Sequence, residues 1–248
     1  MLPLADWLGL KDQRVLVAGA GGIGAACTEA FLEAGARLVV ADQSAERLAD
    51  FAGTAGTVTA DLTTTNGCEQ AVHAAQTELG GLDILVHAVG INNRVPILET
   101  TDEDWDTIIA VNLTSAFRLG RAAGRVMVDA RYGRQIYCSS VSSMLAHPDH
   151  GPYAASKGGL NQLIRVMARE WAASGVTVNA IAPGYVDTAL TSAHLGRPGV
   201  REHYTGMVPA GRLGTVDDLT GPVLYLASQQ AAFVTGHVLY VDGGRTLV

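Results

Sequence analysis

Short apolar runs alternate with amphipathic stretches along nearly the whole chain. Runs rich in Val, Ile, Leu and Ala have the length and composition of buried strands at residues 14–18, 37–41, 57–60, 83–87, 136–141, 176–181 and 237–241. Between them, apolar residues at three- and four-residue steps predict helices at residues 25–34, 66–79, 102–130, 152–173 and 216–227. Strands that alternate with helices predict an α/β chain with a parallel sheet covered on both faces.

No linker, repeat or low-complexity segment interrupts this alternation, so we expect a single domain over residues 1–248. The expected fold is a Rossmann-type doubly wound parallel sheet of about seven strands, which binds ligands beyond the carboxyl ends of its strands. Residues 189–210 lack clean periodicity and contain several Gly, Pro and basic residues. We interpret the segment from about 188 to 210 as a mobile lid over the substrate.

Composition and charge narrow the class of partner. Hydrophobic residues make up 48% of the chain and charged ones 17%, which suits a large buried core. A net charge of −7 without any run of Lys or Arg argues against nucleic acid as a partner. No window reaches the roughly 18 apolar residues of a membrane span, and the N-terminus does not resemble an export signal. Three cysteines without metal-ligand spacing are typical of free thiols in a reducing cytoplasm, and we expect no metal site.

A glycine-rich turn joins the first predicted strand to the first predicted helix. It contains Gly19, Gly21, Gly22, Ile23 and Gly24. The first, second and last glycines fit the dinucleotide pattern Gly-x-Gly-x-x-Gly, in which missing side chains and the helix N-terminus admit a pyrophosphate. Asp42 ends the next strand, where a carboxylate accepts hydrogen bonds from ribose hydroxyls and repels a 2′-phosphate. The alternative is that Asp42 caps the following helix. We expect NAD rather than NADP as the cofactor.

Tyr153 and Lys157 lie four residues apart at the head of an amphipathic helix and therefore share one face. A nearby cation lowers the pKa of a phenol, which then acts as an acid or a base near neutral pH. Ser140 ends a predicted strand that would finish beside this helix. The Tyr-x-x-x-Lys pair alone is also compatible with an ordinary amphipathic helix.

The order of the glycine turn, Asn112, Ser140, Tyr153 and Lys157 resembles the short-chain dehydrogenase/reductase family, from about residue 10 to the C-terminus. The resemblance implies an oxidoreductase that acts on a secondary alcohol or its ketone. In that family, the residue matching Ser140 holds the substrate oxygen and the one matching Tyr153 exchanges its proton. The lysine lowers the tyrosine pKa and bonds the nicotinamide ribose, while the asparagine supports the proton path.

The resemblance also implies further cofactor contacts. The matching positions are Asp61 and Leu62 beside the adenine, Ala88 and Gly90 after the fourth strand, and Pro183, Gly184, Val186 and Thr188 against the nicotinamide. The chain departs from the family pattern where Ala18 replaces a threonine and the glycine turn is one residue shorter. His87 stands where the family has an asparagine, and we interpret it as a structural histidine.

Basic and polar side chains gather at the expected mouth of the pocket. They are Arg94, His147, His150, Arg197, Arg201 and His203. We hypothesise a small polyhydroxylated substrate, a sugar or a sugar acid, that meets Ser140, His150 and Tyr153 and whose anionic group contacts Arg94, Arg197 or Arg201. The alternative is that these side chains are solvated surface.

Two other functions remain open on the sequence. A 3-oxoacyl thioester reductase would share nearly every motif but usually prefers NADP. A catalytically inert dinucleotide sensor would keep the fold for binding partners. The family resemblance further implies a homo-oligomer, a dimer or tetramer, built on helices 102–130 and 152–173, with Met167 and Trp171 as possible contact positions that core packing explains equally well.

Overall fold

The computed structural model describes residues 7–248, apart from the side chains of Ala189 and Leu190. Residues 1–6 lie outside the described residues, and so does most of the N-terminal stretch in which the sequence analysis expected no export signal. Seven strands form one sheet in the order β3-β2-β1-β4-β5-β6-β7, and every neighbouring pair is parallel. They are β1 Arg14–Ala18, β2 Arg37–Asp42, β3 Gly56–Thr59, β4 Ile84–His87, β5 Gly133–Cys138, β6 Val176–Pro183 and β7 Val238–Val241. The strand order reverses direction between β1 and β4, which confirms the predicted doubly wound α/β fold.

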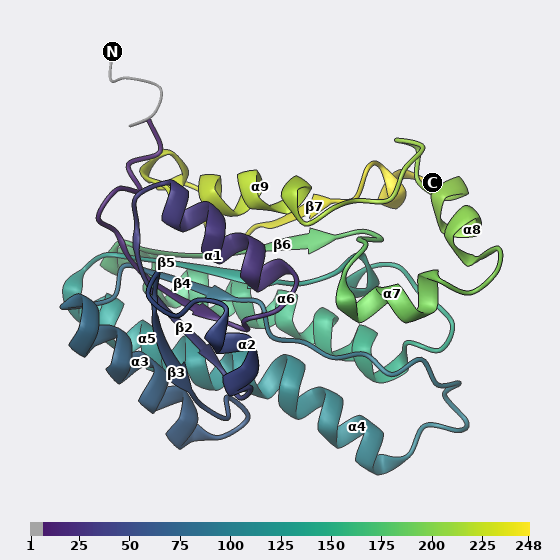
Figure 1. The fold of residues 1–248 in the computed structure, drawn as a ribbon, viewed down its shortest axis with the longest axis horizontal. Coiled ribbons are helices and arrows are strands. Elements are labelled where there is room, and N and C mark those ends of the chain that lie inside the picture. The colour runs from purple at the N-terminus through teal and green to yellow at the C-terminus, as the bar shows by residue number, and fades with distance from the viewer. Residues whose placement is uncertain (1–6) are drawn as a thin grey trace.

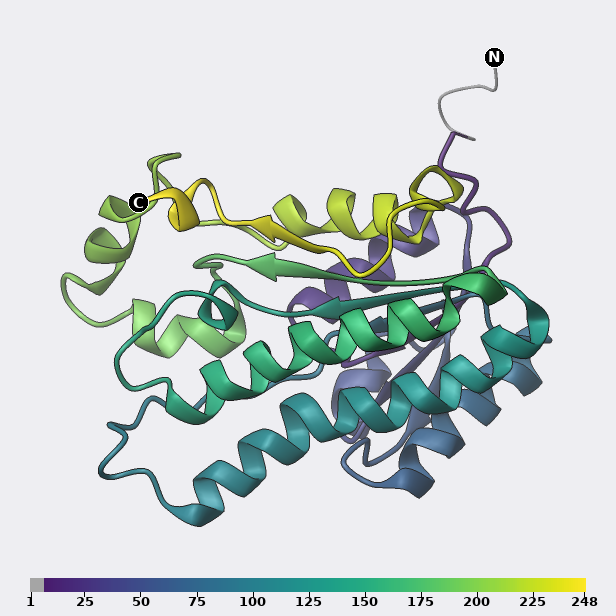
Figure 2. The same ribbon diagram turned by 180° about the vertical axis from the view of Figure 1, so that it is seen from behind.

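Helices cover both faces of the sheet (Figures 1 and 2). They are α1 Ile23–Glu33, α2 Ala45–Ala49, α3 Thr65–Leu79, α4 Asp102–Ile109, α5 Ser115–Ala130, α6 Gly151–Trp171, α7 Ala189–Leu195, α8 Val200–Gly206 and α9 Asp217–Ala227. Alternate residues of a strand point to opposite faces, so β1 contributes to two cores. Val15 and Val17 pack with α1 and α9, whereas Leu16 and Ala18 pack with α3, α5 and α6.

Local sequence signals set the ends of several helices. The Thr64 side chain accepts a hydrogen bond from the Gly67 N–H at the start of α3, and Gly80 ends that helix in the left-handed region with φ 80°. Thr101 and Asp104 form a capping box at the start of α4. These caps hold the segments after β3 and β4 in place.

The predicted helix over residues 102–130 is present but is interrupted by a π-helical turn at Ala110–Thr114. Asn112 lies inside this turn with no exposed surface. Its side-chain amide forms hydrogen bonds with the backbone of Ile91 in the neighbouring segment. The wider π-helical turn therefore occurs where a buried polar side chain bonds outside its own helix.

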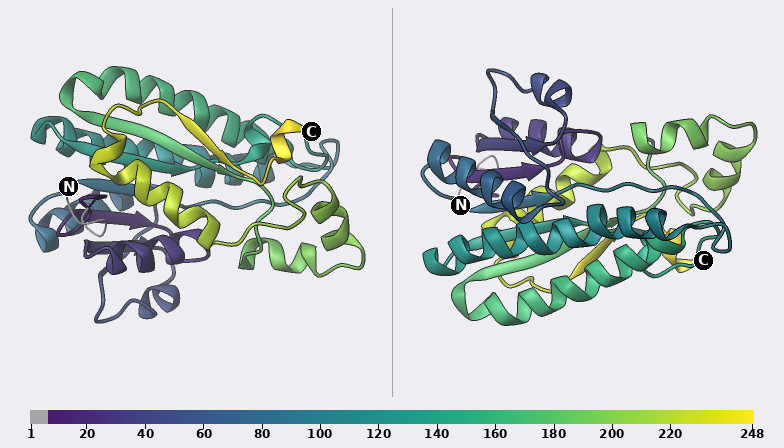
Figure 3. Two further views of the ribbon diagram at one scale, coloured as in Figure 1. Left: turned by 90° about the horizontal axis from the view of Figure 1, so that it is seen from above. Right: turned by 90° about the horizontal axis from the view of Figure 1, so that it is seen from below.

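The segment that the sequence analysis interpreted as a lid contains the short helices α7 and α8. Gly196, Pro198 and Gly199 separate them, which explains why the sequence showed no continuous period. Figure 3 shows the two helices at one end of the molecule, beyond the body of the sheet. This is the end toward which the β6 and β7 arrows point in Figure 2.

The structure corrects one proposed contact position. Met167 is only 4% exposed and packs in the core, so it cannot contact another subunit. Trp171 lies against α5, where a Cβ added to Gly124 would approach its ring to 2.7 Å. Core packing therefore accounts for both side chains.

Candidate active site

The glycine turn connects β1 to α1 at the carboxyl end of the sheet. Gly19 and Gly22 have φ values of 99° and 48°, which favour glycine. A Cβ on Gly24 would lie 1.9 Å from the Gly19 carbonyl oxygen, so α1 approaches the turn too closely for any side chain. The turn therefore exposes backbone rather than side chains, as a pyrophosphate site requires.

Asp42 lies beside this turn at the end of β2 and is only 7% exposed. Its Oδ2 accepts a hydrogen bond of 2.8 Å from the Ala20 N–H, and its Oδ1 accepts one of 2.8 Å from the Ser44 N–H. The cap of α2 is Ser44, whose side chain accepts from the Arg47 N–H. Asp42 is therefore not the helix cap, and its carboxylate borders the glycine turn.

Arg47 is the cation nearest to this carboxylate among the described ion pairs. Its Nη1 lies 3.7 Å from Asp42 Oδ2, and its side chain is 60% exposed. The side chain also runs past Gly21, since a Cβ built there would meet Arg47 Cδ at 3.8 Å. A solvated pair at this distance is weak, so Asp42 keeps most of its negative character.

Tyr153 and Lys157 occupy the first two turns of α6, and Ser140 follows the end of β5. Lys157 Nζ lies 5.6 Å from the centroid of the Tyr153 ring. It donates a hydrogen bond of 2.7 Å to the Cys138 carbonyl oxygen, which ties the ammonium to the end of β5. Ser140 Oγ accepts a bond of 3.1 Å from the Ser142 N–H, so its hydroxyl hydrogen can be directed toward Tyr153 or a substrate oxygen. The predicted trio therefore meets at one point.

The ionisation of this trio differs from the sequence-based expectation. Burial raises the pKa of Tyr153 to about 12, while a hydrogen bond with Ser140 and the charge of Arg94 act in the opposite direction. Burial also lowers the pKa of Lys157. Desolvation of the phenolate is the largest of these effects, so the protein's own groups do not bring the pKa of Tyr153 near neutral pH.

Asn112 lies beside the trio on the π-helical turn. Its Oδ1 accepts a bond of 2.8 Å from the Ile91 N–H, and its Nδ2 donates to the Ile91 carbonyl at 2.9 Å and to Ser156 Oγ at 3.2 Å. The side chain thereby fixes the segment after β4 against α6. This engagement leaves its backbone carbonyl, rather than its amide, as the group that can serve a proton path.

A cavity of about 110 Å³ joins the glycine turn to the trio. Its lining contains Ile23, Ala88, Val89, Gly90, Cys138, Ser139, Ser140, Tyr153, Lys157, Pro183, Gly184, Val186, Thr188 and Thr191. Most of the predicted nicotinamide contacts are in this set. Thr191 was not predicted, because it lies in the lid, where the sequence has no clear period. The residues fit a nicotinamide dinucleotide, since backbone-exposing glycines, the Asp42 carboxylate and the trio follow one another along the strand ends.

Asp61 and Leu62 lie outside this cavity, after β3. Leu62 is buried in the core, and the Asp61 carboxylate accepts bonds from the backbone and hydroxyl of Thr63. These bonds lower the pKa of Asp61. The pair shapes the edge of the sheet next to β2, where the sequence analysis expected the adenine.

The four predicted substrate contacts at the pocket mouth separate into two groups. Arg94 is close enough to lower the pKa of Tyr153, and the His150 ring lies 6.0 Å from the Tyr153 ring. Arg201 is instead paired with Asp187 at 2.7 Å, and Arg197 is exposed. Only the first two therefore face the trio.

The sequence analysis missed several side chains on the same side of the cavity. They are Tyr185, His194, Tyr204 and Arg245. No local signal identifies them, because they come from the segment after β6, the lid and the C-terminal segment. Only the folded chain brings them together.

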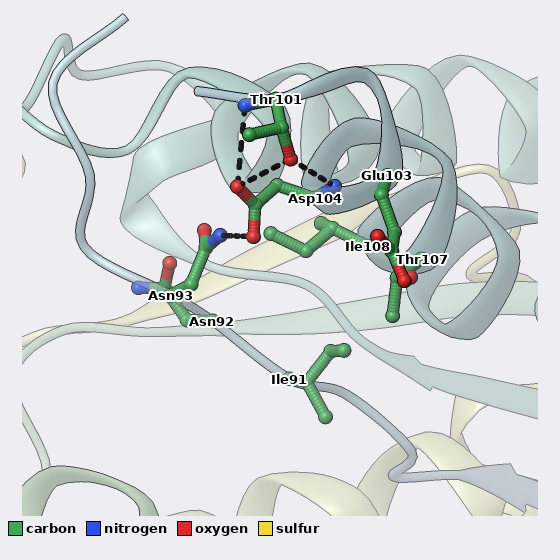
Figure 4. A pocket seen from close by; sticks show the side chains of 8 residues that line it. All are labelled: Ile91, Asn92, Asn93, Thr101, Glu103, Asp104, Thr107 and Ile108. Carbon is green, nitrogen blue, oxygen red and sulfur yellow. Dashed lines mark hydrogen bonds between the residues drawn. The ribbon is translucent and has the colours of Figure 1, made fainter. Parts of the chain in front are cut away.

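A second cavity of about 270 Å³ lies between α4 and the segment after β4 (Figure 4). Glu103 and Asp104 line it, so it is unsuited to an anion. The Asp104 carboxylate is already bonded to Thr101 and Asn93, as the dashed lines in Figure 4 show. Neither Tyr153 nor Lys157 lines this cavity, and we assign the chemistry to the smaller one.

No helix within residues 7–248 is long and apolar enough to cross a membrane.

Comparison with known proteins gives matches over nearly the full length. Residues 17–246 match the family described as enoyl-(acyl carrier protein) reductase. The 3-oxoacyl-[acyl-carrier-protein] reductase FabG of Vibrio cholerae is 37% identical over 246 residues, covering 97% of this chain and 100% of that protein. Galactitol 2-dehydrogenase (L-tagatose-forming) of Cereibacter sphaeroides is 39% identical over 239 residues, covering 93% and 94% of the two chains.

A solved structure extends the likeness to three dimensions. The gluconate 5-dehydrogenase of Burkholderia cenocepacia J2315, crystallised with NADP and tartrate, is 33% identical and superposes with a TM-score of 0.93. The match covers 99% of this chain and all of that one.

Proposed function

Because the chain belongs to the short-chain dehydrogenase/reductase family and is an oxidoreductase of CH–OH or keto groups, we propose that it uses NAD to interconvert a small polyhydroxylated alcohol and its ketone. The observation that carries the proposal is the meeting of Ser140, Tyr153 and Lys157 at the cavity that the glycine turn also reaches. A sugar or sugar acid suits the polar mouth of that cavity.

The protein groups divide the work of the reaction. Ser140 donates its hydroxyl hydrogen to the substrate oxygen, and Tyr153 exchanges the proton. Lys157, held by the Cys138 carbonyl, keeps two N–H donors for the nicotinamide ribose and the proton path. A bound nicotinamide supplies the hydride acceptor or donor, and its oxidised form adds a positive charge beside Tyr153.

The pKa of Tyr153 affects ketone reduction and alcohol oxidation differently, because each direction requires a different protonation state of the phenol. With a pKa of about 12 from its protein surroundings, the phenol is protonated at neutral pH and ready to protonate a reducing carbonyl. Alcohol oxidation needs the phenolate, which becomes more abundant as the pH rises. Oxidation should therefore be favoured at higher pH than reduction.

Asp42 supports the preference for NAD over NADP. Its buried carboxylate borders the glycine turn, and a 2′-phosphate placed beside it would meet a negative charge that the exposed Arg47 compensates only in part. The relative from Burkholderia cenocepacia was crystallised with NADP, so cofactor choice varies among similar chains. Arg47 is too exposed to reverse the charge of Asp42.

A 3-oxoacyl thioester reductase is the second candidate, because the relative from Vibrio cholerae carries that name. The mouth of the cavity favours a smaller and more polar substrate, since Arg94, His150 and Tyr204 surround it.

Three unpaired cysteines suit a reducing compartment such as the cytoplasm, which we include in the proposal.

The test is a set of assays on the wild type with NAD and NADP, using D-gluconate, galactitol, D-glucitol and a 3-oxoacyl thioester. We expect kcat/KM to favour NAD by about tenfold or more, a difference of about 1.4 kcal/mol. Asp42→Ala should narrow that gap, because it removes the charge that opposes the 2′-phosphate. Equal use of both cofactors, or best turnover with the thioester, would contradict the proposal.

A further inference from the structure

A wall of aromatic and basic side chains leads away from Tyr153. The His150 ring lies 6.0 Å from Tyr153, the His147 ring lies 5.6 Å from His150, and the Tyr185 ring lies 5.8 Å from His147. Tyr204 continues the series, with its ring 4.1 Å from that of Tyr185. The wall therefore begins at the reacting phenol and extends to the lid.

Four neighbouring strands contribute to this wall. Arg94 follows β4, His147 and His150 follow β5, Tyr185 follows β6, and Arg245 follows β7. These strands lie side by side in the order β4-β5-β6-β7, so the segments after them meet at the carboxyl end of the sheet. Figures 1 and 2 place the C-terminus next to α8 at that end.

Arg245 is held facing the wall. Its guanidinium bonds the Tyr185 side chain and lies close enough to His147 to lower the pKa of that ring. Its Nη1 donates a bond of 2.9 Å to the Val248 carbonyl oxygen. The turn before it is fixed to the end of the lid, because the Gly243 carbonyl accepts a bond of 3.0 Å from the Ala210 N–H.

No Asp or Glu side chain within residues 7–248 forms an ion pair with Arg94 or Arg245. The nearby acids are occupied or exposed. Asp187 pairs with Arg201, and Asp242 accepts bonds from the Gly244 and Thr246 N–H groups. Asp149 faces His150 and is exposed. Two partly buried guanidinium groups therefore share one site without a side-chain carboxylate from the described residues as a counter-ion.

Buried polar atoms of the wall also lack hydrogen-bond partners among the described residues. They are Arg245 Nε, His147 Nε2 and His194 Nδ1. A buried polar group without a partner costs about 1–3 kcal/mol. Three such atoms beside two arginines that lack an acidic side-chain partner indicate a place for an acceptor that the described side chains do not provide.

The histidines do not add to the charge of this wall at neutral pH. Burial, and then the neighbouring cations, lower the pKa of His147 to about 4 and lower those of His150 and His194 as well. The positive charge therefore belongs to the two arginines. Neutral imidazoles remain available as hydrogen-bond donors to a ligand oxygen.

We propose that Arg245, together with Arg94, binds the carboxylate of an acyclic sugar acid. The inference rests on the proposed function, because it takes Ser140 and Tyr153 as the place where the hydroxyl or keto group reacts. Since His150 and His147 lie between Tyr153 and Arg245, the reacting carbon and the carboxylate are several carbon atoms apart. A guanidinium group suits this task because it offers two parallel donors to a carboxylate.

D-Gluconate and D-glucitol are matched probes, because they share a six-carbon polyol chain and differ in the carboxylate. Isothermal titration calorimetry of the NADH-loaded enzyme should show that the wild type binds gluconate about tenfold more tightly or better, as expected for hydrogen bonds to a charged group. Arg245→Met should remove most of this preference, and Arg245→Lys should keep part of it. Arg165→Met is the control, because Arg165 is exposed on α6 and bonds only Gln162 in the described structure.

The Tm and the affinity for NADH show whether each variant is folded. If Arg245→Met does not fold, the gluconate preference of Arg245→Lys tests the inference instead. An unchanged gluconate preference in a folded Arg245 variant, or no preference in the wild type, would overturn the inference. Binding is measured without turnover. If gluconate binds through Arg245 but no polyol or sugar acid is oxidised, the proposed function fails and the inference stands.

Discussion

Tyr153 and Lys157 illustrate how far single residues can be understood from their neighbours in sequence. Their spacing places both on one face of α6, and the structure has them there. Their ionisation depends on packing, which spacing does not describe. Lys157 is only 3% exposed, and burial shifts the pKa of each group toward its neutral form.

His87 is a second residue whose role depends on its surroundings. It is fully buried at the end of β4, and its Nε2 lies 3.0 Å from Ser115 Oγ. Ser115 donates in turn to the Val111 carbonyl at 2.5 Å, in the π-helical turn that carries Asn112. Burial lowers the pKa of His87 to about 3, so the ring is neutral. It therefore supports the turn structurally, as the sequence analysis interpreted it.

The glycine turn contains two kinds of glycine, which the Gly-x-Gly-x-x-Gly pattern does not distinguish. A Cβ on Gly24 would lie 1.9 Å from a backbone oxygen of Gly19, which has no room to move. A Cβ on Gly21 would meet only Arg47, at 3.8 Å. Packing between β1 and α1 therefore requires a glycine at Gly24 but not at Gly21.

Gly24→Ala should therefore destabilise the protein even without cofactor. Overpacking costs about 1–3 kcal/mol or more, and each kcal/mol lowers the Tm of a chain this long by roughly 2–4 °C. Thermal unfolding of the apoprotein should show a fall of several degrees for this variant. Gly21→Ala is the matched control and should leave the Tm within about 1 °C. Equal Tm values for the two variants would refute this account of the turn.

The lid shows where element prediction fails. Residues 189–210 have no clean periodicity in the sequence, yet they contain α7 and α8. Each helix has seven residues, which is two turns and too short for a periodic pattern to be recognised. The strands were easier, because continuous apolar runs bounded by polar residues are distinctive in a sheet that is buried on both faces.

The whole molecule exposes apolar side chains on helices that the family resemblance assigned to subunit contacts. Trp105 on α4 and Phe117 on α5 are 42% and 41% exposed. Large exposed rings on adjacent helices are typical of a subunit interface. We therefore expect a homo-oligomer whose contact includes α4 and α5.

Light scattering at micromolar concentration should give a mass that is a multiple of the 25.8 kDa chain. Phe117→Glu should shift the distribution toward smaller species, because a buried unpaired carboxylate opposes association. A wild-type mass of one chain would exclude this interface.

The site as a whole was predictable in the parts that rest on local spacing. The glycine turn, Ser140, Tyr153 and Lys157 come from short motifs at strand ends, which a parallel sheet brings to one edge. The wall around Arg245 could not be predicted in this way. Its members follow four different strands, and they become neighbours only through the order β4-β5-β6-β7. Fold topology supplies what single motifs lack.

The most direct test of the central claim, that Tyr153 exchanges the proton during hydride transfer, is the kcat of Tyr153→Phe. General acid–base catalysis contributes about 10²–10⁴-fold, so kcat should fall by at least about a hundredfold while the affinity for NADH stays within a few-fold. Tyr225→Phe, on the exposed side of α9, is the control and should retain wild-type kcat. A Tyr153→Phe enzyme that kept more than about a tenth of wild-type kcat would contradict the account.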